Sequence, residues 1–134
     1  MHKKVFLILL LLILAGVSWS QNIDAPLISP DDARAILSNG KDVLLLDVRT
    51  HDEFVARHIP GAVLFPSAEI NKDSAARVIG PDFGRLLIVY CASGGRSKAS
   101  SALLLSLGYT NVWNLGGISS WPFEVEKGEA PASR

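Results

Sequence analysis

The sequence predicts an α/β domain with a mainly parallel central sheet and helices on both faces. Short apolar runs at residues 43–46, 63–65 and 86–90, together with a strand-like segment at 112–115, alternate with segments that carry helix start and stop signals. The longer runs are apolar at consecutive positions, which is typical of parallel strands buried on both faces. Strands that alternate with helices along the chain favour this architecture.

Residues 1–20 have the features of a secretory signal peptide. Lys3 and Lys4 precede a 13-residue apolar run at 5–17, and small residues come just before Gln21. A membrane-spanning helix needs about 20 apolar residues, so the run is short for an anchor. We expect cleavage before Gln21 and an exported protein, periplasmic or secreted, with an uncleaved anchor as the alternative.

The remaining 114 of the 134 residues suffice for one domain. We expect a linker at 21–27, the domain at 28–126 and a flexible tail at 127–134. Of the 13 basic side chains two lie in the signal segment, so 11 face 13 acidic ones, a net charge of −2. That charge argues against a nucleic-acid partner. We also expect the protein to be a monomer.

The first helix is expected to begin after Ser29, a favoured N-cap residue. Pro30 suits the first helical position, and two carboxylates follow in the first turn, where the helix dipole favours them. Asn39 and Gly40 end the helix. Its buried stripe comprises Ala33, Ile36 and Leu37.

Charged residues follow the strand at 43–46. Ligand sites lie at the carboxyl ends of parallel strands, so we expect Asp47 to support the site by hydrogen bonding to the cysteine loop or to Arg96. Thr50 and Glu53 match a capping box that starts a short helix. We also expect a surface ion pair between Arg49 and Glu53.

Beyond the strand at 63–65, the sequence predicts a partly polar helical stretch and a turn at 81–84. A helix at 97–107 ends at Gly108, and two glycines after the last strand permit a tight turn into a short helix near Trp121. We expect that tryptophan in the core or in a pocket wall.

The chain contains a single cysteine, Cys91, between the strand at 86–90 and the helix at 97–107. Glycines in the intervening loop let backbone N–H groups converge, and a helix N-terminus adds further N–H groups, so an anion or a thiolate is stabilised there. Without a partner for a disulfide, Cys91 is either a reactive thiol or an inert core residue, and its setting favours the former. The residues expected to bind the substrate are Ala92, Ser93, Gly94, Gly95, Arg96 and Ser97.

Four segments together resemble the rhodanese-like domain family. They are the cysteine loop at 91–97, Asp-Val-Arg at 47–49, His-Ile-Pro-Gly-Ala at 58–62, and Asn-Leu-Gly-Gly at 114–117 with Trp121. The resemblance implies a single-domain sulfurtransferase that moves sulfane sulfur from thiosulfate or a persulfide to a thiophilic acceptor through a Cys91 persulfide.

The resemblance also implies a structural role for His58, although a histidine is able to activate a thiol. His51, at a helix start, is expected to face solvent. The sequence has no paired cysteine and histidine spacing of the kind that holds zinc, so neither a metal nor a cofactor is expected. The expected partners are a small sulfur-donor anion, a thiol or cyanide acceptor, and as a further candidate a redox or sulfur-carrier protein.

Two other functions remain open. One is a cysteine-dependent oxyanion enzyme of the phosphatase or arsenate reductase type; such phosphatases place one residue more between cysteine and arginine than the four found here. The other is a catalytically silent binding module. Some thiosulfate-using members of the family place cations directly after the cysteine, where this chain has Ala92 and Ser93. Arg96 and Lys98 are then the nearby positive charges, and weaker thiosulfate capture is expected.

Overall fold

The computed structural model describes residues 23–40 and 42–130. The expected signal peptide and its cleavage position lie outside these residues. Four strands form one parallel sheet, in the spatial order β2, β1, β3, β4. Their bounds are Val43–Asp47 for β1, Val63–Leu64 for β2, Leu86–Cys91 for β3 and Val112–Gly117 for β4. The predicted parallel sheet is therefore confirmed.

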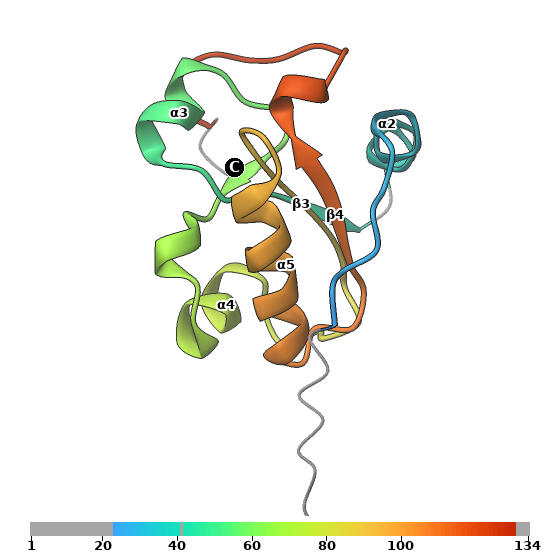
Figure 1. Ribbon diagram of the computed structural model, residues 1–134, viewed down its shortest axis with the longest axis vertical. Coiled ribbons are helices and arrows are strands. Elements are labelled where there is room, and N and C mark those ends of the chain that lie inside the picture. Colours follow the sequence, from blue (N-terminus) through green and yellow to red (C-terminus); the bar gives the residue numbers. More distant parts are fainter. Residues whose placement is uncertain (1–22, 41, 131–134) are drawn as a thin grey trace, which may run out of the picture.

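Helices cover both faces of this sheet, as predicted. Helices α4 (Lys72–Val78) and α5 (Gly95–Ser106) pack on one face, and α2 (Pro30–Ser38) and α3 (His51–Ala56) contribute to the core on the other. Figure 1 shows α5 and α2 on opposite sides of β4. Within the described part of the chain, no helix is both long and apolar enough to cross a membrane.

Local capping signals place the helix starts. The Ser29 hydroxyl accepts a hydrogen bond of 3.1 Å from the Asp32 N–H, and Thr50 forms the predicted capping box with Glu53. Helix α5 begins at Gly95, two residues before the expected start, after Gly94 in the left-handed conformation (φ 111°). The loop after β3 is therefore short, and three of its expected residues lie in the first helical turn.

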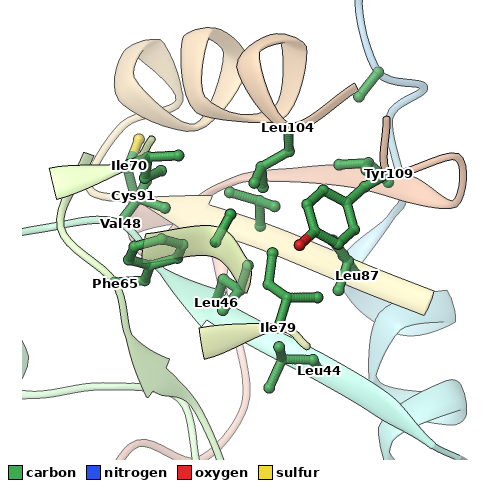
Figure 2. Close-up of a cluster of buried hydrophobic side chains, with 14 residues drawn as sticks. Leu44, Leu46, Val48, Phe65, Ile70, Ile79, Leu87, Cys91, Leu104 and Tyr109 are labelled. Carbon is green, nitrogen blue, oxygen red and sulfur yellow. The ribbon is translucent and has the colours of Figure 1, made fainter. Parts of the chain in front are cut away.

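Two apolar clusters, one on each face of the sheet, form the core. Side chains alternate between them along the strands: Leu46 and Val89 lie in the cluster under α4 and α5, and Leu45 and Ile88 lie in the other. Figure 2 shows the first cluster, with Cys91 at the end opposite Tyr109.

The buried face of α5 consists mainly of small polar side chains. Leu104 is fully buried, whereas Leu103 is exposed, and the other buried positions of the helix are occupied by serines. These small residues are Ser97, Ser100 and Ser101. Small side chains let a helix backbone approach a sheet closely.

Two irregular segments lie against the sheet and its helices. In the expected linker, Leu27 forms a β-bridge with Asn114 of β4. At the start of the expected tail, the Gly128 N–H donates to the carbonyl oxygen of Val55 in α3 (2.8 Å). Residues 131–134 lie outside the described residues.

Candidate active site

Cys91 is the last residue of β3, and only 1% of its surface is exposed. Its sulfur accepts a hydrogen bond of 3.1 Å from the Gly94 N–H. The strand carries the cysteine to the carboxyl edge of the sheet, and the glycine turn folds back over the sulfur. Of the backbone N–H groups predicted to converge on the sulfur, the one at Gly94 donates to it.

The last three residues that were expected to bind the substrate belong to α5. Gly95, Arg96 and Ser97 form the first helical turn, in which backbone N–H groups have no partner within the helix. The Ser97 hydroxyl lies 3.0 Å from the Gly94 carbonyl oxygen and 3.3 Å from that of Gly116. Ser97 is fully buried and so ties the turn to β4.

The balance of burial and hydrogen bonding lowers the pKa of Cys91. Burial raises it, but hydrogen bonds from the Ser97 hydroxyl and from the backbone N–H groups of Ser97, Gly94 and Ser93 together outweigh burial. The Ser97 hydroxyl has one hydrogen and three acceptors within reach, namely the sulfur and two carbonyl oxygens, so it serves one of them at a time. The loop therefore stabilises the thiolate of Cys91 relative to that of an ordinary cysteine.

The end of strand β4 lies directly against the loop. A shift in register between β3 and β4 at Val89 and Tyr90 brings Gly117 opposite Cys91. A Cβ atom at Gly117 would lie 2.7 Å from the Cα of Ser93, closer than real side chains approach, so only glycine fits there.

Arg96 is directed to a helix on the other side of the loop. Its guanidinium forms two hydrogen bonds with Glu53 of α3, of 2.7 Å and 2.9 Å. These hydrogen bonds from Arg96 are the main reason that the pKa of Glu53 falls to about 2, with contributions from Thr50, while burial opposes the fall. The predicted pair of Arg49 with Glu53 is wrong, because Glu53 points to the start of α5.

Asp47 and Arg49 form a buried ion pair instead of contacting the loop. The Asp47 carboxylate accepts from the Arg49 guanidinium at 2.7 Å and from its backbone N–H at 3.0 Å. The expected hydrogen bond of Asp47 to the cysteine loop or to Arg96 is therefore not the one observed. Residues two apart at a strand end project to the same side, which brings carboxylate and guanidinium together. Arg49 also donates to the Arg57 carbonyl oxygen, so the pair braces the end of α3.

His58 and His51 lie as predicted, the first in a structural position and the second facing solvent. His58 is buried, stacks on the Phe54 ring at 3.8 Å and lies 3.0 Å from the Phe54 carbonyl oxygen through Nδ1, which is a structural arrangement. His51 is exposed and lies 2.8 Å from Glu129. Among residues 23–40 and 42–130, no three His, Cys, Asp or Glu side chains gather in a way that could hold a metal ion.

Two features of the site were not predicted from the sequence. The bond between Glu53 and Arg96 joins residues 43 positions apart, and only the residue types hint at it. The need for glycine at 117 was likewise hidden, although the glycine pair after β4 marked an unusual turn.

The fold and the site together define an α/β protein with a buried cysteine whose sulfur accepts a hydrogen bond from the loop at the start of a helix. The rhodanese-like domain family matches residues 29–123. The chain belongs to this family.

Several relatives and solved structures resemble the chain. The protein HIGH ARSENIC CONTENT 1 of Arabidopsis thaliana, mitochondrial, is 36% identical over 74% of this chain and 63% of its own length. The human thiosulfate:glutathione sulfurtransferase is 32% identical over 69% of this chain and 89% of its own. The structure of the human single-domain sulfurtransferase TSTD1 is 29% identical, with a TM-score of 0.63, over 72% of this chain and 95% of that one. The chain thus spans less than two thirds of the Arabidopsis protein.

Proposed function

We propose that the protein is a sulfurtransferase in which Cys91 carries a sulfane sulfur from a small donor to a thiophilic acceptor. The observation that best supports this is the 3.1 Å hydrogen bond from the Gly94 N–H to the Cys91 sulfur at a helix start. The backbone N–H groups of the loop would also stabilise the terminal sulfur of a persulfide, which is likewise an anion. The name of the human relative supports the same chemistry.

In the proposed reaction, the Cys91 thiolate attacks the outer sulfur of thiosulfate or of a persulfide. A new S–S bond forms as the donor's S–S bond breaks, and the electron pair leaves on sulfite or on a thiolate. An acceptor thiolate or cyanide then attacks the terminal sulfur and releases the Cys91 thiolate. The two steps balance without an oxidant, a metal or a cofactor.

The partners belong to this proposal as well. They are a small sulfur-donor anion and a thiol or cyanide acceptor, with a redox or sulfur-carrier protein as a candidate for the physiological role. The proposal also includes an exported, monomeric protein.

Intact mass measurement tests the central step. Protein treated with thiosulfate should gain one sulfur atom that a reductant removes, and it should form thiocyanate from cyanide. The Cys91→Ser variant should gain no sulfur and lose transfer outright, because a serine oxygen cannot form the persulfide. Sulfur uptake by that variant would contradict the proposal.

An oxyanion enzyme is the second candidate, and the name of the Arabidopsis relative refers to arsenic content. Parallel assays with an aryl phosphate and with arsenate plus a thiol reductant separate the candidates. We expect negligible turnover of both, because four residues separate Cys91 from Arg96 and the ring of N–H groups is small. Turnover of either without sulfur transfer would reverse the ranking, and the absence of all three activities would favour a silent binding module.

A further inference from the structure

The two cations that follow Cys91 in sequence both face carboxylates. Arg96 binds Glu53 through two hydrogen bonds of 2.7 Å and 2.9 Å. Lys98 lies 3.7 Å from Asp24, with both side chains more than half exposed. The positive charge that the sequence places beside the cysteine is thus balanced by negative charge from other parts of the chain.

Arg96 is the cation that lies closer to the cysteine in the sequence, in the first turn of α5 and two residues after Gly94, whose N–H donates to the Cys91 sulfur. Its pKa is raised chiefly by the hydrogen bonds to Glu53, and the negative charge of the Cys91 thiolate raises it further. The start of α5 thus carries both the N–H group that donates to the Cys91 sulfur and the guanidinium that Glu53 binds. At 39% side-chain exposure, Arg96 is also open to solvent, where an incoming anion arrives.

We propose that Glu53 is a specificity-determining residue, because by binding Arg96 it disfavours doubly charged donors such as thiosulfate relative to singly charged persulfides. This inference rests on the proposed sulfur transfer. An incoming donor meets an ion pair instead of a lone cation, and the repulsion by the carboxylate scales with the charge of the donor. The backbone N–H groups of the loop serve both donors alike.

Glu53 has a second function that a test must preserve. Its Oε1 atom accepts hydrogen bonds from the Thr50 N–H (3.3 Å) and the Thr50 hydroxyl (3.1 Å), as part of the capping box of α3. Glutamine is also accepted at this position of a capping box. The Glu53→Gln variant therefore removes the charge and keeps an acceptor for the helix start.

The experiment compares kcat/KM for thiosulfate and for an alkyl persulfide with no other charged group, using one acceptor thiol at low ionic strength. Glu53→Gln should raise kcat/KM for thiosulfate about three- to tenfold, mainly through KM, and that for the persulfide about twofold or less. Asp31→Asn is the matched control. It makes the same change in net charge at an exposed position of α2, across the sheet from α5, and should change neither value.

The unmodified protein provides a second test. Because Glu53 balances the charge of Arg96 in the unmodified protein, kcat/KM for thiosulfate should change less than about twofold between about 0.02 M and about 0.2 M salt. The kcat/KM of Glu53→Gln should fall severalfold over the same range. This arm stays informative if the variant folds poorly.

The outcomes separate this inference from the proposed function. A folded Glu53→Gln variant that changes both donors equally, or loses thiosulfate activity, would overturn the role of Glu53, and so would a steep salt dependence of the unmodified protein. Sulfur transfer would then still stand. Failure of the unmodified protein to accept sulfur from either donor would overturn both.

Discussion

At the scale of single residues, the chemistry depends on how the surroundings of Cys91 treat its charge. The thiol is buried, which by itself favours the neutral form, yet the N–H groups of the loop and the Ser97 hydroxyl favour the thiolate more. A cysteine in this position gains reactivity from backbone geometry and does not need a neighbouring histidine as a base. This agrees with the position of His58, whose ring packs on Phe54.

The lowered pKa of Cys91 predicts a shift in its reaction with alkylating agents. The thiolate is the reactive form, so the rate of alkylation by iodoacetamide should rise with pH around a midpoint below that of an ordinary thiol. The same chain unfolded in urea serves as the reference, because it keeps the cysteine and loses the loop. A midpoint in the folded protein at or above the unfolded one would contradict this account.

At the scale of elements, the site is an assembly of β3, β4, α3 and the start of α5. Gly117 of β4 lies so close to Ser93 that its lack of a side chain sets the position of the loop. Gly117→Ala should displace the loop, reduce sulfur transfer at least about tenfold and destabilise the protein by about 1–3 kcal/mol. Gly84→Ala is a matched control, because an added Cβ there makes an ordinary contact of 3.4 Å. Full activity of the Gly117 variant would show that the loop tolerates the displacement.

The ion pair between α3 and α5 predicts a change of stability in acid. The pKa of Glu53 is lowered from 4.5 to about 2 in the folded protein, so its contribution is fully present above about pH 4.5 and is lost as the pH falls toward 2. Both side chains are about a third exposed, and solvent screening limits the contribution to about 1 kcal/mol. Urea unfolding at pH 6 and at pH 3 should show this loss in the unmodified protein and a smaller one in Glu53→Gln. Equal losses would mean that the pair adds no measurable stability.

At the scale of the whole molecule, much of the fold follows from local signals. The capping residues Ser29 and Thr50 predicted the starts of two helices, and the apolar runs predicted strands. Each of these signals acts within a few residues. The pairing of Glu53 with Arg96 and the register shift that faces Gly117 with Cys91 depend on how distant segments pack. No local pattern of residues determines such contacts.

The fate of the whole chain in the cell is a further prediction. The basic start and the apolar run of the first 20 residues predict a mature protein that begins at Gln21. The intact mass of protein recovered from the exported compartment of the producing cell would test this. A full-length species held in membranes would instead indicate an uncleaved anchor.

The serine-lined face of α5 links the packing of the helix on the sheet to the chemistry of the site. Within the described part of the chain, the buried Ser101 hydroxyl has no hydrogen-bond partner, an arrangement that costs about 1–3 kcal/mol. A larger apolar residue in place of such a serine would remove the unpaired hydroxyl, but it would overpack the space between the helix and the sheet and push them apart. Here the displaced helix would take its first-turn N–H groups away from the Cys91 sulfur. Variants with larger side chains on this face should therefore be the poorer catalysts, because the close fit of one side of one helix also positions the N–H groups of the site.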